Sequence, residues 1–146
     1  MTKTSTISSN VEAVKSAYEH FSKGDAQALL AGFSDEMEFR VAEGHPYQPS
    51  GQAWLGKQEI VEKFLMKAGQ EWDGWSMHPE EFHDLGDTVV VEGRYHGLYK
   101  PTGRQMNLQV CHVWRLRDGM IRSFHQYLNT AELQRVMGTG LTNDRP

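Results

Sequence analysis

A change in the spacing of apolar residues, partway along the chain, limits the fold more than any other feature of the sequence. As far as residue 68, apolar side chains recur at the spacing of one helix face. From residue 75 onward they alternate with polar side chains, which predicts β-strands. Short turns separate four such runs, and Asp118-Gly119 is the clearest because this pair suits a type I′ hairpin. Strands joined by turns this short must pair antiparallel, and we expect them at 75–85, 88–99, 104–117 and 120–128.

Amphipathic helices are expected before this set of strands. Residues 10–23 place Tyr18 and Phe21 on one face, and Ser9 or Asn10 is expected to cap the helix. Further helices are expected at 26–33, 57–68 and 130–137, a short strand at 37–41, and an irregular stretch rich in glycine and proline at 42–56.

This order of elements indicates an α+β domain in which helices pack on one face of a sheet. A long antiparallel sheet tends to twist and curl around the helices that it covers. A length of 146 residues is that of one domain. We expect the domain to cover 10–137, with flexible tails at 1–9 and 138–146.

Charge and composition exclude several classes of partner. The net charge is -4 and the basic residues are scattered, so we expect no nucleic-acid partner. No apolar run approaches the ~20 residues that span a bilayer, so we expect no membrane partner. The segment MTKTSTISSN lacks the apolar part of a signal peptide. The single cysteine, Cys111, cannot form an internal disulfide, and both features favour the cytoplasm.

Two segments of the sequence resemble those of a known superfamily. They are YEHFSKGDAQALLAGFSDEMEF near the start and HVWRLRDGMIRSFHQYLNTAEL near the end. With the element order between them, the chain resembles the nuclear transport factor 2-like superfamily over 10–137, and most closely its SnoaL-like and ketosteroid isomerase-like branch. The resemblance implies a cone-shaped fold, with three to four helices packed in a strongly bent, mostly antiparallel sheet. It also implies a pocket for a small apolar molecule. The superfamily includes enzymes and non-catalytic adaptors, so the fold does not fix the function.

The expected strand 104–117 directs one ionisable side chain into the core. Its even positions are apolar except for His112, and Trp114 lies two residues further along the same face. One interpretation is a core histidine satisfied by a hydrogen bond. The other is a pocket donor or base. The resemblance favours the second, because ketosteroid isomerases hold an oxyanion-stabilising acid at this position and SnoaL-like cyclases hold a histidine.

Two positions depart from the catalytic pattern of the superfamily. The catalytic aspartate on the last strand of SnoaL-like cyclases is matched by Gln126, and the base of ketosteroid isomerases is matched by Val41. Neither residue can act as a base near neutral pH. Glu43 could replace that base from its loop, which also carries His45, Tyr47 and Trp54.

The expected strand 88–99 admits two orientations. Its local pattern directs valines inward and Glu92, Arg94 and His96 to solvent, because unpaired charges are costly to bury. The resemblance to limonene epoxide hydrolases reverses this, since their Arg-x-Asp pair falls on Arg94 and His96. The valine face would then pack against another copy of the chain, from which we expect a homodimer.

Two hypotheses for the function remain open. The first is a cofactor-independent acid/base isomerase, cyclase or lyase, and the second is a non-catalytic ligand-binding or protein-interaction module. No metal-ligand spacing, phosphate loop or dinucleotide motif is present, so we expect neither metal nor cofactor. Trp72 and Trp75 are expected to serve packing rather than recognition. The candidate catalytic residues are His112, Glu43 and Arg94, and the candidate substrate-binding residues are Tyr18, His45, Tyr47, Trp54, His96, Trp114, Phe124 and Gln126.

Overall fold

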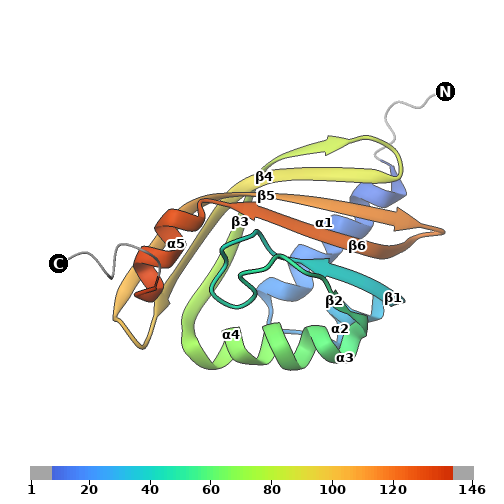
Figure 1. Ribbon diagram of the computed structural model, residues 1–146. Coiled ribbons are helices and arrows are strands. Elements are labelled where there is room, and N and C mark those ends of the chain that lie inside the picture. The colour runs from blue at the N-terminus through green and yellow to red at the C-terminus, as the bar shows by residue number, and fades with distance from the viewer. Residues whose placement is uncertain (1–7, 140–146) are drawn as a thin grey trace.

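A six-stranded sheet curves over the helices α1 to α4, and helix α5 lies at one end of the sheet (Figure 1). The computed structural model describes residues 8–139. The tails expected at 1–9 and 138–146 lie largely outside these residues, although Ser9 begins α1 and Gly138 caps the end of α5. No helix within residues 8–139 has the length and apolar character needed to cross a membrane.

The strands are ordered β2-β1-β6-β5-β4-β3 across the sheet. β1 and β6 pair in parallel and the other neighbours pair antiparallel, so the sheet is mostly antiparallel as predicted. The last three strands have the predicted bounds, whereas β3 begins before residue 75. The strands are β1 (Phe33–Arg40), β2 (Trp54–Leu55), β3 (Trp72–Asp84), β4 (Thr88–Tyr99), β5 (Arg104–Arg117) and β6 (Met120–Leu128).

Helix α1 (Ser9–Ser22) begins one residue earlier than the expected start at residue 10. The side chain of Ser8 caps it by accepting a hydrogen bond from the backbone N–H of Val11, so the prediction of Ser9 or Asn10 is wrong. The Asp118-Gly119 turn has φ angles of 54° and 79°, and two positive φ angles in succession are those of the predicted type I′ hairpin. Helix α5 (Thr130–Met137) has the predicted bounds.

The helix expected at 26–33 is shorter than predicted, because α2 (Ala26–Ala31) ends before Gly32. Phe33 instead begins β1, and the N–H of Ile121 on β6 donates to the carbonyl of Gly32 at 2.9 Å. Phe33 is only 2% exposed. Pairing with a distant strand and burial of a large ring therefore outweigh the local helical pattern, as tertiary context commonly does.

The helix expected at 57–68 contains a turn of π-helix. It consists of α3 (Gly56–Ile60), the π-helix η1 (Val61–Leu65) and α4 (Met66–Glu71) in direct succession. Single π-turns within helices often occur at functional sites, because they redirect the side chains that they carry. Here the redirected side chains include Phe64 and Leu65, which line the cavity described below.

Strand β4 has the orientation that its local pattern predicts. Val89 and Val91 are completely buried in the core of their own chain, and Glu92 is exposed. The inward orientation of Arg94 and His96, taken from the resemblance to epoxide hydrolases, is therefore wrong. The burial of these valines also removes the argument for a dimer that was based on a valine face.

Candidate functional site

A cavity of about 60 Å³ lies between the sheet and the helices that it covers. Its walls come from α1, α2, η1 and every strand except β2, because the sheet bends around this space. The lining side chains are mainly aromatic: Ala17, Tyr18, Phe21, Leu29, Phe33, Phe39, Phe64, Leu65, Trp75, Met77, Tyr95, His112, Trp114 and Phe124.

A chain of hydrogen bonds joins several side chains in and beside the wall of this otherwise apolar cavity. The hydroxyl of Tyr18 lies 2.8 Å from Nδ1 of His112, and the hydroxyl of Tyr95 lies 2.6 Å from Nε2 of the same ring. Trp114 Nε1 donates to the Tyr18 hydroxyl at 2.9 Å, and Gln126 Nε2 donates to the Tyr95 hydroxyl at 2.8 Å. Every ring nitrogen and hydroxyl oxygen in the chain therefore has a partner.

Burial fixes the charge state of these groups. His112 is 3% exposed, and removal from water lowers its pKa to about 3, because the protonated ring loses its hydration. Burial also raises the pKa of Tyr18, although its hydrogen bond from Trp114 opposes the shift. Burial raises the pKa of Tyr95 in the same way. At neutral pH the imidazole is therefore neutral and both tyrosines keep their protons.

With His112 neutral, this hydrogen-bond chain holds one more donor proton than its two hydroxyl–imidazole hydrogen bonds use. Tyr18, Tyr95 and neutral His112 each carry one donor proton, which makes three in all. The two contacts between the hydroxyls and the ring consume two of them. One hydroxyl proton is therefore left for another acceptor, whichever tautomer the imidazole adopts.

The surroundings of the two tyrosines decide where this proton lies. If His112 carries its proton on Nε2, the spare proton is on Tyr95, and there Gln126, with its amide oriented so that Nε2 faces the hydroxyl, presents an N–H rather than an acceptor. A buried donor without an acceptor costs about 1–3 kcal/mol. If His112 carries its proton on Nδ1, the spare proton is on Tyr18, which lines the cavity as Tyr95 also does. The geometry therefore favours a Tyr18 hydroxyl that offers its proton to the cavity.

Three further buried side-chain atoms lack a hydrogen-bond partner within the described part of the chain. They are Trp75 Nε1, Gln126 Oε1 and His45 Nε2. Trp75 lines the cavity, so its indole N–H is a second donor at this site. His45 lies outside it, where the backbone N–H of Tyr47 donates to its Nδ1 at 3.0 Å. Burial lowers the pKa of His45 to about 4.

Five of the predicted site residues lie in or beside the cavity. Tyr18, His112, Trp114 and Phe124 line it, and Gln126 reaches it through the Tyr95 hydroxyl. The predicted alternation of β5 explains the placement of His112 and Trp114, since the inward positions of this strand are all buried.

The other predicted site residues do not share this space. Glu43 is exposed, its charge acts on His125, and it does not line the cavity that His112 lines. Arg94 Nε donates to Asn107 Oδ1 at 2.9 Å on the outer face of the sheet. The remaining predicted residues lie elsewhere: His96 packs against His78, Tyr47 donates to Glu71, His45 packs beside Tyr47, and Trp54 is buried against Phe39.

Tyr95 and Trp75 are site residues that the sequence analysis missed. Tyr95 lies on the same inward face of β4 as Val91, so the alternation already placed it in the core. No sequence signal pairs it with His112, because the two residues come from neighbouring strands whose register depends on the turn between them. Trp75 was assigned to packing only.

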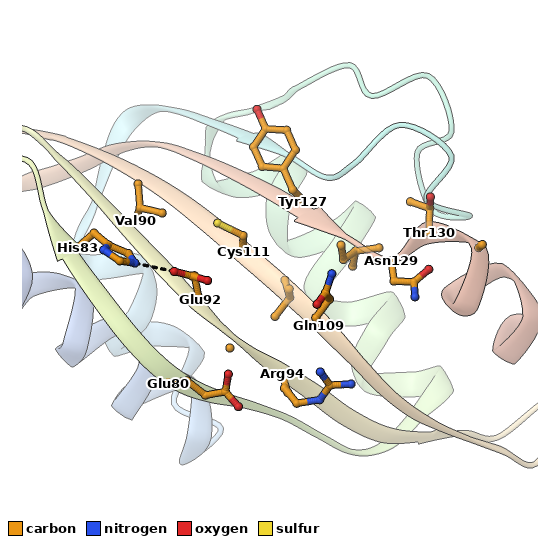
Figure 2. Close-up of a pocket in the computed structure, with 14 residues that line it drawn as sticks. Glu80, His83, Val90, Glu92, Arg94, Gln109, Cys111, Tyr127, Asn129 and Thr130 are labelled. Atoms are coloured by element: carbon orange, nitrogen blue, oxygen red, sulfur yellow. Dashed lines mark hydrogen bonds and ion pairs between the residues drawn. The ribbon is translucent and has the colours of Figure 1, made fainter.

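A groove of about 750 Å³ lies on the outer face of the sheet (Figure 2). The cavity described above lies on the other face. Figure 2 shows side chains of β3, β4, β5 and β6 along it, including Glu92, Arg94, Cys111 and Tyr127. Burial, followed by the nearby charge of Glu92, raises the pKa of the Cys111 thiol. This cysteine is therefore a poor nucleophile, because the thiolate is the reactive form.

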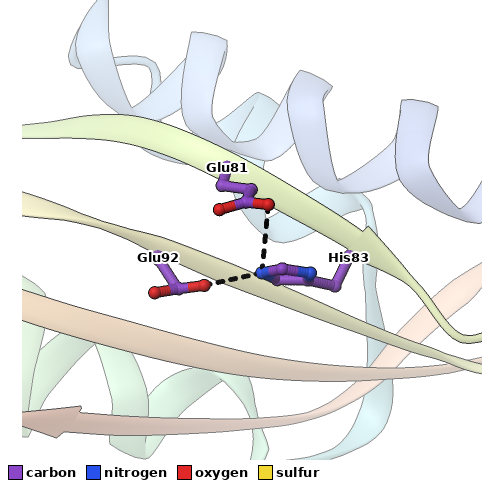
Figure 3. A group of neighbouring side chains, drawn as sticks. All are labelled: Glu81, His83 and Glu92. Carbon is purple, nitrogen blue, oxygen red and sulfur yellow. Dashed lines mark hydrogen bonds and ion pairs between the residues drawn. The ribbon is translucent and has the colours of Figure 1, made fainter.

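The same face carries a group of side chains that could hold a metal ion (Figure 3). One ligand atom from each of Glu81, His83 and Glu92 lies within 4.8 Å of the others. His83 Nε2 lies 2.6 Å from a carboxylate oxygen of Glu92 and 4.0 Å from one of Glu81. Both carboxylates are exposed, and ion pairing with the imidazole accounts for the arrangement.

Comparison with solved structures identifies the fold. An NTF2-like protein from Burkholderia thailandensis is 30% identical, with a TM-score of 0.82 over 90% of this chain and 98% of that chain. TerC co-crystallised with polyporic acid is 28% identical, with a TM-score of 0.80 over 90% of this chain and 100% of that chain. A protein from Catenulispora acidiphila with a ketosteroid isomerase-like fold, in complex with trimethylamine, is 16% identical with a TM-score of 0.74, covering 92% and 97%.

Comparison with sequence families identifies the domain. No curated protein matches the chain. The sequence model of the SnoaL-like domain matches residues 14–124, which include most of α1 and most of the sheet together with Tyr18, Tyr95 and His112. The match agrees with the cone-shaped α+β fold and with the resemblance carried by the two sequence segments. The chain therefore belongs to the SnoaL-like domain family.

Proposed function

We propose that the protein binds a small, mostly apolar molecule whose acceptor oxygen enters the cavity and takes the hydrogen bond of Tyr18. The spare proton of the Tyr18–His112–Tyr95 chain is the observation that carries this proposal. An apolar pocket with a few placed polar groups is the usual form of a small-molecule site. The co-crystal of the similar protein TerC with polyporic acid supports a small-molecule ligand.

The cavity supports a binding role better than a catalytic one. Its lining, within the described residues, contains no carboxylate, and His112 with a pKa of about 3 is a poor base at neutral pH. The alternative is an acid/base isomerase, cyclase or lyase. It is favoured by the Tyr18 hydroxyl, which could stabilise negative charge that develops on a bound carbonyl oxygen. Neither proposal invokes a cofactor or a metal ion.

Binding of polyporic acid to wild-type protein and to Tyr18→Phe tests the proposal. We expect saturable quenching of tryptophan fluorescence, because Trp114 and Trp75 line the cavity. We expect Tyr18→Phe to bind about tenfold more weakly, since a hydrogen bond contributes ~1 kcal/mol or more. Tyr127→Phe is the matched control, because Tyr127 is 50% exposed on the outer face of β6.

Two results would contradict this account. Equal affinity of wild type and Tyr18→Phe would remove the tyrosine as donor. Turnover of the bound compound above the uncatalysed rate, abolished in Tyr18→Phe, would replace the binding role with the enzymatic alternative.

We also propose a homodimer in which the outer face of the sheet is the contact surface. The support is the groove of about 750 Å³ on that face, beside the half-exposed ring of Tyr127. Light scattering at micromolar concentration should give twice the chain mass, and a mass of 16.6 kDa would contradict a dimer.

We also propose that the protein resides in the cytoplasm, because the free thiol of Cys111 suits a reducing compartment. Cell fractionation would test this.

A further inference from the structure

A second hollow lies directly beside the cavity lined by Tyr18 and His112, which is called the inner cavity from this point on. This vestibule has a volume of about 300 Å³ and lies between the end of α1, the helix η1–α4 and the start of β3. Four side chains line both spaces: Phe21, Phe64, Leu65 and Trp75. These four residues therefore lie between the vestibule and the inner cavity, and the boundary that they form is called the neck.

The inner cavity is too small to hold an aromatic ligand alone. Its volume is about 60 Å³. An apolar cavity of ~150 Å³ is known to hold one benzene molecule. Only the oxygen-bearing end of a ligand fits beside Tyr18, and a larger body must extend through the neck into the vestibule.

Trp75 presents an unused hydrogen-bond donor at this neck. Its Nε1 is buried and has no partner within residues 8–139, whereas Nε1 of the neighbouring Trp72 donates to the Tyr47 hydroxyl at 3.2 Å. Leaving a buried N–H unpaired is costly, and such groups in native structures call for an explanation. An acceptor atom of a ligand in the neck would supply the missing partner.

The backbone around the neck departs from regular structure on two sides. The pairing register of β3 with β4 shifts between Asp73 and Ser76, on either side of Trp75. The π-helix η1 carries Phe64 and Leu65. Strand irregularities and π-turns re-aim side chains and gather beside binding sites.

We propose that the inner cavity and the vestibule are two halves of one site, and that Trp75 recognises a second acceptor oxygen of the ligand at the neck between them. The inference rests on the proposed function, because it takes Tyr18 as the donor at the inner end. The ligand is then elongated: a small carbonyl-bearing end lies by Tyr18, a second acceptor oxygen lies by Trp75, and a flat apolar body lies in the vestibule.

A matched pair of probes tests the recognition by Trp75. Benzoylacetone and benzylacetone share an acetyl group and a phenyl ring, but only benzoylacetone has a second carbonyl beside the ring. Wild type should bind benzoylacetone about tenfold more tightly, the usual effect of one additional hydrogen bond in a buried site. Trp75→Phe keeps an aromatic ring and loses the N–H, so the preference for benzoylacetone over benzylacetone should disappear.

Gly69 on α4 offers a test of the vestibule. It lines the vestibule and not the inner cavity, and an added Cβ there meets nothing within 4 Å. Gly69→Leu should fill the vestibule and weaken both probes at least tenfold, whereas Gly69→Ala, which adds a single methyl group, should weaken them less. A leucine variant that binds both probes as wild type does would overturn the two-part site.

The results separate this inference from the proposed function. A preference for benzoylacetone that persists in Trp75→Phe overturns the role of Trp75 and leaves the Tyr18 donor intact. If Trp75→Phe loses the preference for benzoylacetone, the role of Trp75 is supported. If Tyr18→Phe nevertheless binds benzylacetone as tightly as wild type does, the Tyr18 donor is overturned. A wild-type protein that binds neither probe overturns both.

Discussion

Lowering the pH from about 7.5 to about 5 should reduce the free energy of unfolding by about 4 kcal/mol, through His45 and His112 together. Burial holds the pKa of His112 at about 3 and that of His45 at about 4. In the unfolded chain both rings titrate near the ordinary histidine value of about 6.5. The unfolded state therefore gains protons over this range and the folded state does not.

The sign follows from proton linkage. Because the unfolded state binds more protons, stability falls as the pH drops below about 6.5, and each histidine contributes about 2 kcal/mol by pH 5. Desolvation and the charges of Arg40 and Arg115 lower the pKa of His125, which acts in the same direction. Carboxylates remain mostly ionised over this range, so the buried imidazoles dominate the change.

Urea denaturation at the two pH values measures the effect. His45→Gln should remove about half of the pH dependence, whereas the exposed His78→Gln serves as a matched control and should keep it. A wild-type protein whose stability is the same at both pH values would show that these rings are not buried and neutral.

Replacing Gly93 by alanine should destabilise the protein by about 3 kcal/mol, the upper range for overpacking a tight interior. Gly93 lies on β4 opposite Pro79 of β3. A Cβ at this position would overlap the carbonyl oxygen of His78, and it would lie 2.7 Å from Cε of Met77 and 3.1 Å from Cα of Pro79. Met77 can move, but the two backbone contacts require the strands to separate.

Gly69→Ala is the matched control for this substitution. Gly69 lies in α4 with nothing within 4 Å of an added Cβ, so alanine should stabilise the helix by about 0.5–1 kcal/mol. Thermal unfolding of both variants gives the comparison. If Gly93→Ala unfolds at the wild-type temperature, β3 and β4 do not approach each other as closely as described here.

The sequence predicts the sheet well because its signals there are local. The alternation along β4, β5 and β6 and the Asp118-Gly119 turn depend on nearest neighbours, and all three strands have the predicted bounds. The inward direction of His112 follows from the same alternation. The helix expected at 26–33 fails where a non-local contact decides, since Phe33 pairs with β6.

The partners of His112 could not be predicted, because they come from distant segments. Tyr18 is 94 residues away in the sequence and Tyr95 is 17 residues away, and only the curvature of the sheet brings both hydroxyls to one ring. The resemblance to limonene epoxide hydrolases implied a role for Arg94, and Glu43 was considered because Val41 stands where ketosteroid isomerases hold their base. The structure places both side chains away from the cavity.

The state of the His112 ring is the central claim, and nitrogen-15 NMR of the imidazole measures it directly. The account predicts a neutral ring with its proton on Nδ1 throughout the range from about pH 5 to about pH 8, which leaves the spare hydroxyl proton on Tyr18. A ring protonated on Nε2 would place that proton on Tyr95 and contradict the assigned donor. A ring that titrates near the ordinary value of about 6.5 would contradict the neutral, buried hydrogen-bond chain itself.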